Sequence, residues 1–200
     1  MRRQVAAAIA AIAALLAITA CAGSAGDPGA TQTASNGDKF NDADVAFATD
    51  MIPHHAQTIQ MVNMTLGREV EPKVQQLAED IRATQTTEVE QMVDWLTAWD
   101  KKIPRTAIDH GNAHGDGGGE MHHDLPGMMS PDELAALETA GDSEFRARWL
   151  QMMIQHHQGA IELAQAEQEN GVFPPAVDLA EQIEAAQKRE VEALQGLLDS

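Results

Sequence analysis

Apolar residues recur at steps of three, four and seven positions over long stretches of this chain, which is the spacing of one face of an α-helix. The clearest stripe, between residues 72 and 101, contains Val74, Leu77, Ile81, Val89, Met92, Leu96 and Trp99. Runs of β-branched residues, which favour strands, are absent, and Ala, Glu, Gln, Leu and Met dominate. The pattern therefore predicts an all-α protein.

Start and stop signals divide the pattern into four long helices and a short one. Glycines that follow the first and third long helices and prolines that open the second and fourth predict helices over 42–66, 72–101, 143–170 and 174–198. Ser130-Pro131-Asp132-Glu133 resembles a capping box and predicts a short helix that ends near Thr139. Pro53 falls inside the first helix and is expected to kink it.

The helical pattern is duplicated with an offset of 102 residues. Met51-Ile52-Pro53-His54-His55 recurs as Met153-Ile154-Gln155-His156-His157, and 17 of the 50 residues in 47–96 are identical to their partners in 149–198. Each repeat is one αα-hairpin with an exposed apolar face, and pairing the two hairpins buries both faces. We expect a four-helix bundle at 40–200, with repeat one at 42–101, a connection at 102–141 and repeat two at 142–200.

The first forty residues differ from the rest in composition. A short basic start and an apolar run too short to span a membrane predict a lipoprotein signal peptide at 1–20, with Cys21 as the lipidated residue. An ordinary signal peptide with an incidental cysteine is the alternative. Residues 21–39 are rich in Gly, Ser, Thr, Asn and Asp and are expected to form a flexible tether. The protein is thus expected to be secreted and lipid-anchored to the outer face of the cytoplasmic membrane.

The charge and the cysteine count restrict the partners. The net charge is −18 for the whole chain, and it becomes −20 without residues 1–20 because that segment carries two arginines and no acidic residue. Such a surface argues against nucleic acid as a partner, since phosphates require basic side chains. The single cysteine excludes a disulfide within the chain and a cysteine-based metal site.

Methionine and histidine are kept together at one helical level in both repeats. Met51 lies three and four residues before His54 and His55, so that it stacks with both on a helix, and the second copy has the same spacing. Thioether and imidazole together favour Cu(I), with Ag(I) as a surrogate. The other interpretation is that the methionines fill the core and the histidines are satisfied polar residues within it. The candidate metal ligands of the bundle are Met51, His54, His55, Met61, Met152, Met153, His156 and His157.

Two glutamines are expected at the level of the histidines. If each hairpin is antiparallel about its turn, Gln85 and its repeat partner Gln187 fall opposite the histidine pairs, on apolar stripes where an unpaired polar side chain is costly. We expect these glutamines to hold the histidine rings by hydrogen bonds. A glutamine pair bonded across the bundle is the alternative. Glu88 and Glu190, one turn further on, either take the same role or face water.

The connection contains a second group of histidines and methionines. A His-rich and Met-rich composition is typical of metal binding, and a solvated loop is the alternative. Met128 and Met129 come just before the short helix and are expected to fold over the open end of a site between the first and third long helices. The candidate ligands from the connection are His122, His123, Met128 and Met129, beside which lie His110, His114 and Met121.

Taken together, these motifs resemble the bacterial domain-of-unknown-function family 305. The resemblance covers about 40–198 and rests on the two Met-Ile-x-His-His motifs, on Gly127-Met128-Met129-Ser130 and on the Gln-Gly-Ala that follows the second motif. It implies a ferritin-like, extracytoplasmic four-helix bundle, similar to periplasmic copper-resistance proteins that bind Cu(I) and Ag(I) through Met and His. Ala56-Gln57-Thr58 replaces the Gln-Gly-Ala of the second copy, so the two halves need not bind metal equally.

Three functions are compatible with the sequence. The favoured one is a copper-binding lipoprotein that sequesters or transfers Cu(I) in copper homeostasis, with a transfer partner that the sequence does not identify. A ferritin-like di-metal enzyme would need a Glu three residues before a His, and neither histidine pair has one. A metal-free helical interaction module of the cell envelope is the third. No catalytic group is evident, and we expect the protein not to be an enzyme.

Overall fold

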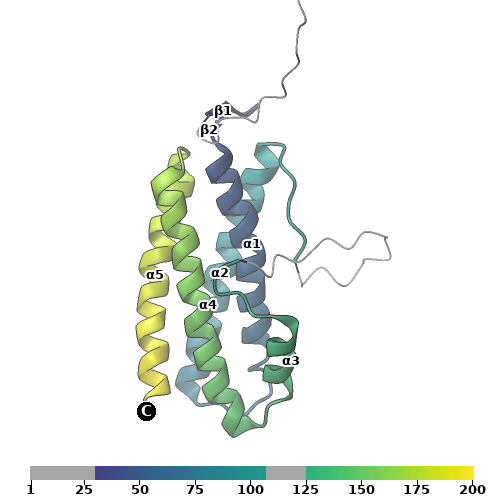
Figure 1. Cartoon of the computed structure of the whole chain (residues 1–200), viewed down its shortest axis with the longest axis vertical. Helices are drawn as coiled ribbons and strands as arrows, with labels where there is room; N and C mark the ends of the chain where they lie inside the picture. The colour runs from purple at the N-terminus through teal and green to yellow at the C-terminus, as the bar shows by residue number, and fades with distance from the viewer. Residues whose placement is uncertain (1–29, 107–124) are drawn as a thin grey trace, which may run out of the picture.

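Four long helices lie side by side along the long axis of the molecule in Figure 1, and a fifth, short helix flanks them. The computed structural model describes residues 30–106 and 125–200. In this part of the chain the helices are α1 (Asp42–Asn63), α2 (Pro72–Ala98), α3 (Pro131–Thr139), α4 (Asp142–Asn170) and α5 (Pro174–Leu198). The predicted all-α, ferritin-like four-helix bundle is confirmed.

The bundle is assembled from two hairpins. Helix α1 packs against α2, and α4 packs against α5, while α1 and α4 form the main contact between the hairpins. Asp44 ties the start of α1 to the turn between α4 and α5, because its carboxylate accepts hydrogen bonds from the backbone N–H groups of Asn41, Val172 and Phe173. The side chain of Asn41 in turn accepts from the backbone of Ala43 and Asp44, which completes a capping box.

Most helix boundaries agree with the sequence, and two do not. The capping box at Ser130 is present, with the Ser130 side chain accepting from the Glu133 N–H and the Glu133 carboxylate accepting from the Ser130 N–H. Helix α1 ends three residues earlier than expected, because the chain turns at 64–66. Helix α2 ends before Trp99, and Asp100 has a φ of 55° that no α-helix accommodates. Pro53 lies inside α1 without ending it.

The segment expected to be a flexible tether is ordered where the structure describes it. Strands β1 (Gln32–Thr33) and β2 (Lys39–Phe40) form an antiparallel hairpin. Its turn contains Gly37 at a φ of 94°, a conformation that glycine adopts without strain. The Phe40 ring stacks on Trp99 with the ring centroids 4.5 Å apart, which anchors the hairpin on the end of α2. The tether prediction is therefore corrected for 30–39, and residues 1–29, with Cys21, lie outside the described residues.

The core consists of two apolar clusters separated by a polar layer. The hairpin-end cluster contains Phe47, Met51, Met92, Leu96 and Ile183 among others. The α3-end cluster contains Met61, Ile81, Met129, Trp149, Met152 and Met153 among others. Between them along each long helix lie seven polar side chains that are at most 3% exposed: His54, His55, Thr58, Gln85, His156, His157 and Gln187. Seven buried polar side chains near one level are the feature of this core that requires an explanation.

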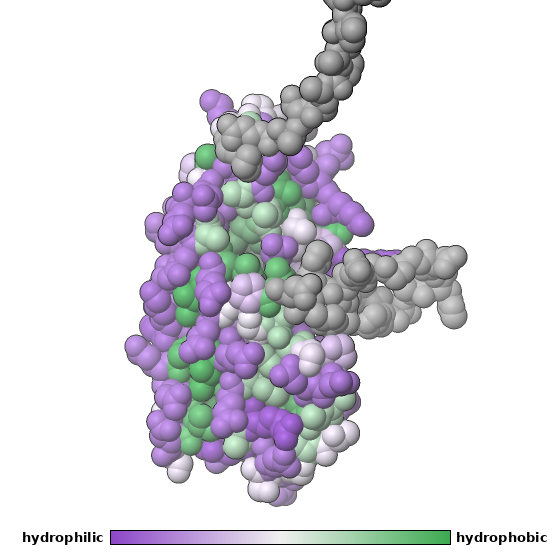
Figure 2. All heavy atoms as spheres, in the orientation of Figure 1, coloured by the Kyte–Doolittle hydropathy of each residue, from purple (hydrophilic) through white to green (hydrophobic). Residues whose placement is uncertain are grey.

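The face of the molecule seen in Figure 2 is mixed, with hydrophilic side chains along its outer edges and apolar side chains between them. Within 30–106 and 125–200, no helix is both long enough and apolar enough to cross a membrane.

Candidate metal centre

Four imidazole rings meet in the interior of the bundle, two from α1 and two from α4. All four side chains are at most 1% exposed to solvent. The rings of His54 and His156 face each other across the α1–α4 contact, with centroids 3.9 Å apart and planes inclined by 46°. His55 and His157 lie on the outer sides of this central pair, toward α2 and α5. The sequence predicted this gathering of the two histidine pairs, and the structure brings all four together.

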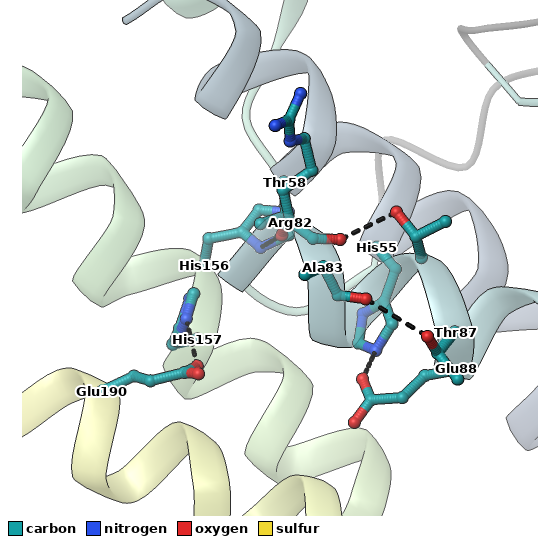
Figure 3. A network of polar contacts seen from close by, with 10 residues as sticks. His55, Thr58, Arg82, Ala83, Thr87, Glu88, His156, His157 and Glu190 are labelled. Carbon is teal, nitrogen blue, oxygen red and sulfur yellow. Dashed lines mark hydrogen bonds and ion pairs between the residues drawn. The ribbon is translucent and has the colours of Figure 1, made fainter. Parts of the chain in front are cut away.

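Each outer ring is bonded to a carboxylate from the second helix of its own hairpin. The His55 Nε2 atom lies 2.7 Å from Glu88 Oε2, and the His157 Nε2 atom lies 2.9 Å from Glu190 Oε2 (Figure 3). The Nδ1 atoms of both rings are buried without a hydrogen-bond partner. Each outer imidazole is thus held at one nitrogen and open at the other.

The two central rings are held differently from each other. The His54 Nε2 atom lies 3.0 Å from the Pro126 carbonyl oxygen and donates to it, because a carbonyl only accepts. The His156 Nδ1 atom lies 3.2 Å from Thr58 Oγ1. The remaining nitrogens, His54 Nδ1 and His156 Nε2, are buried and unpartnered. All four rings therefore have one buried nitrogen that no protein group satisfies.

The central rings are neutral at neutral pH. Burial lowers the pKa of His54 to about 3, helped by the charges of His55 and His157 and opposed by the bond to Pro126. Burial also lowers the pKa of His156 well below its ordinary value, and the three neighbouring histidines lower it further. Neutral imidazole is the form that coordinates a metal ion.

The predicted methionines flank the histidine layer on both sides. Met51 is fully buried in the hairpin-end cluster, which also contains Met92 from the apolar stripe of α2. Met61, Met129, Met152 and Met153 share the α3-end cluster and are between 0% and 9% exposed. Met128 is half-buried, and His122 and His123 lie outside the described residues. The structure thus places thioethers on both sides of the imidazoles.

The segment Leu125–Met129, here called the strap, lies across α1 and α4 beside the central pair. The Gln57 side chain makes two hydrogen bonds to the Met129 backbone, accepting from its N–H at 2.7 Å and donating to its carbonyl at 2.9 Å. On α4, Gly159 leaves the room that Pro126 occupies, since a Cβ there would lie 1.9 Å from the Pro126 carbonyl oxygen. Strap and helices together close this side of the histidine layer.

The strap explains why the repeats differ just after their histidines. Gln57 and Thr58 of the first copy correspond to Gly159 and Ala160 of the second. Gln57 holds the strap and Thr58 bonds His156, whereas Gly159 makes space for Pro126. The positions at which the two repeats differ therefore form the binding site for the strap, a single segment that contacts both repeats.

The expected role of the two glutamines is corrected. Both amide atoms of Gln85 and the Oε1 atom of Gln187 are buried without a hydrogen-bond partner, and neither glutamine bonds a histidine. Glu88 and Glu190 bond the outer rings instead. Gln85 and Glu88 are separated by almost one helical turn, so both face the histidine level. The side chains of Glu88 and Glu190 are 12% and 19% exposed, so their carboxylates keep part of their hydration.

The donor set limits the chemistry. Within 30–106 and 125–200, no three side chains among His, Cys, Asp and Glu converge on one point that a metal ion could occupy. A metal ion held among these rings as they stand would take at most two imidazoles and would need methionine sulfur as well. Sulfur with imidazole suits Cu(I), and it does not suit hard divalent cations.

The comparisons with known proteins agree with the fold. The family model described as domain of unknown function DUF305 matches residues 44–198. A DUF305 fragment from Deinococcus radiodurans has 27% sequence identity and a TM-score of 0.68, with 84% of this chain and 99% of that chain covered. A DUF305 protein from Streptomyces coelicolor, named as a candidate secreted protein, has 27% identity and a TM-score of 0.66, with 78% and 91% covered.

A third similar structure is a metal complex. CopM in its Cu(II)-bound form has 29% identity and a TM-score of 0.62, with 78% of this chain and 95% of that chain covered. CopM has also been solved in Cu(I)-bound, Ag-bound and apo forms, and these match this chain at TM-scores of 0.61 to 0.60. Among curated proteins, none matches the chain.

Proposed function

This chain belongs to the DUF305 family, and we propose that it is an extracytoplasmic copper protein that holds Cu(I) between its two repeats through histidine and methionine. Its role is to sequester Cu(I) or to pass it on in copper homeostasis, without catalysis. Ag(I), which shares the preference of Cu(I) for soft donors, binds in its place.

One observation carries the proposal: four buried imidazoles each keep one nitrogen without a partner. A buried polar atom left unpaired costs about 1–3 kcal/mol, so four at one level destabilise the bundle unless something binds there. Coordination of Cu(I) by His54 Nδ1 and His156 Nε2, with sulfur from the flanking Met51 and Met153, satisfies the central pair. The low pKa of both central rings keeps them unprotonated and ready to bind.

The comparisons support the choice of metal. CopM, which shares the fold and has 26–29% identity, takes Cu(I), Cu(II) and Ag. Because this chain keeps soft and borderline donors at the level where its repeats meet, we propose copper binding for it as well.

The location follows from the N-terminus. Residues 1–20 have the composition of a signal peptide, and Cys21 stands where lipidation takes place. We propose that the mature protein is anchored by lipid to the outer face of the cytoplasmic membrane. There, methionine is a better soft ligand than cysteine because it forms no disulfides.

A competitive Cu(I) titration of the mature chain against a chromophoric chelator, under reductant, tests the proposal. The double change His54→Ala and His156→Ala is expected to weaken Cu(I) binding at least about 100-fold, since loss of a residue that merely supports a ligand already costs 10–100-fold. The matched control is His110→Ala with His114→Ala in the connection, and circular dichroism confirms that both variants are folded. Greater damage in the control, or displacement of Cu(I) by Zn(II), would contradict the proposal.

A further inference from the structure

The two carboxylate–imidazole pairs are the most symmetric polar feature of the structure. In each repeat the histidine and glutamate are 33 residues apart, and both bonds join Nε2 to Oε2. The histidines are fully buried, whereas the side chains of Glu88 and Glu190 are 12% and 19% exposed. The residues just before the glutamates differ between the repeats, Thr86-Thr87 against Lys188-Arg189. Both repeats have therefore kept the pair while its neighbours changed.

The bond determines which nitrogen of each ring is free. A carboxylate oxygen accepts, so the proton of the neutral imidazole stays on Nε2. Nδ1 then carries the lone pair, and it is the nitrogen that lies buried without a partner in both rings. His54 shows the same pattern, because its Nε2–H donates to Pro126 and its Nδ1 is free. A carboxylate or carbonyl on one nitrogen commonly orients a histidine that binds metal through the other.

We propose that Glu88 and Glu190 are positioning residues that fix the tautomer and the orientation of His55 and His157, so that each repeat presents Nδ1 as a donor for a soft metal ion. The inference rests on the proposed copper function and deepens it, because it makes each outer histidine a donor in its own repeat, besides the central pair, and names the atom through which it binds. Each glutamate acts on the histidine of its own hairpin.

Isosteric variants test the role. Glu88→Gln and Glu190→Gln replace a charged acceptor with a neutral amide that both accepts and donates, which removes the preference for a proton on Nε2. The matched controls are Glu90→Gln and Glu192→Gln, which lie on the same helices, are repeat partners of each other, are exposed and make the same change in charge. Circular dichroism establishes that all four variants fold like the wild type.

The readout is the ¹⁵N chemical shift of each ring nitrogen in long-range ¹H–¹⁵N spectra, first metal-free and then during titration with Ag(I), which is diamagnetic. In the wild type, His55 and His157 are expected to be protonated on Nε2, and Ag(I) is expected to shift Nδ1. Glu88→Gln should mix the tautomers of His55 alone and weaken Ag(I) binding about tenfold, and Glu190→Gln should do the same for His157. The control variants should match the wild type.

The possible failures are distinct. Ag(I) shifts at Nε2, or glutamine variants at 88 and 190 that keep both the wild-type tautomers and the wild-type affinity, would overturn the positioning role alone. A wild-type chain that takes up neither Ag(I) nor Cu(I) would overturn the proposed function itself. A merely structural ion pair would change the thermal stability of the variants and leave the tautomer and the bound atom as they are.

Discussion

Replacing Gly159 with alanine should detach the strap from the histidine layer. A Cβ at this position would lie 1.9 Å from the Pro126 carbonyl oxygen, 2.3 Å from its carbon and 2.7 Å from the Gly127 nitrogen. Contacts under 3.0 Å are essentially never found for real Cβ atoms, so backbone must move by about 1 Å. The contacted atoms belong to the main chain of the strap and cannot rotate away as a side chain would.

The cost follows from the bonds that the movement breaks. The strap is held by the bond from His54 to Pro126 and by the two bonds between Gln57 and Met129. At about 1 kcal/mol each, their loss costs about 3 kcal/mol. Alanine in place of glycine in a helix returns about 1 kcal/mol through its higher propensity. The expected net loss in the free energy of unfolding is therefore about 2 kcal/mol.

Urea unfolding followed by circular dichroism measures this loss, with Gly196→Ala as the matched control. Gly196 also lies in a long helix, and a Cβ there would have no atom within 4 Å. The control should gain up to about 1 kcal/mol from helix propensity. If Gly159→Ala proves as stabilising as Gly196→Ala, the strap does not rest on α4, and the explanation of the repeat asymmetry is refuted.

Three further changes have predicted outcomes. Burial lowers the pKa of His54 to about 3 and that of His156 well below 6.5, so below pH 6.5 the unfolded chain binds protons that the folded chain does not. The urea midpoint should therefore fall as the pH drops from about 6.5 toward 3, and a midpoint that does not change with pH would contradict buried neutral rings. Burial, followed by the neighbouring Asp44 carboxylate, raises the pKa of Glu167 from 4.5 to about 8, so this group's stabilising contribution is complete below pH 4.5 and is lost as the pH rises toward 8. Glu167→Gln should therefore match the wild type in stability near pH 5 and exceed it near pH 9 in the same urea assay, and equal stability at both pH values would refute the shift. Thr58→Val should cost about 1–3 kcal/mol by leaving His156 Nδ1 unpaired, and a neutral result would show that this contact does not hold the ring.

The helices, and the height along the bundle at which the histidines lie, could be predicted from the sequence because both depend on local spacing. A periodicity of three and four residues determines which face of a helix is buried, and the repeat offset brings two Met-Ile-x-His-His motifs to one level of an antiparallel bundle. Caps, glycines and prolines located the helix starts to within one residue. Helix ends were less accurate, because the last turns at 64–66 and 99–101 depend on tertiary contacts.

The polar residues that bond the histidine rings were harder to predict from the sequence. In an antiparallel hairpin, residues at equal distances from the turn lie opposite each other, which locates the partner of a residue to within about one helical turn. This precision does not distinguish Gln85 from Glu88. The partly exposed position of Glu88, where its carboxylate keeps some hydration, distinguishes it from the buried Gln85, and this exposure depends on how the helices pack. The carboxylates are the ring partners whose role the sequence left open, although their retention in both repeats was a visible signal.

The course of the strap was predicted in part, whereas the N-terminal β-hairpin was missed. Met128 and Met129 were expected over the first and third long helices, and the structure places the strap against α1 and α4. The bonds that hold it join residues 72 positions apart, and their one local signal was the replacement of Gly-Ala by Gln57-Thr58 in the first repeat. The β-hairpin had a local signal, since Asn36-Gly37 is a strong turn sequence. The polar composition of the surrounding residues outweighed it, and the stacking of Phe40 on Trp99 is a long-range contact that composition does not predict.

X-ray absorption at the copper edge of the Cu(I)-loaded mature protein tests the central claim most directly, because it identifies the atoms bound to the metal. Histidine and methionine together predict both a sulfur shell and the multiple scattering of imidazole, and the imidazole component should weaken in the His54→Ala, His156→Ala variant, in which only the outer histidines remain. A sulfur-only shell would restrict the site to methionine. A shell of nitrogen and oxygen without sulfur, or imidazole scattering of unchanged strength in the variant, would contradict a Cu(I) site between the repeats.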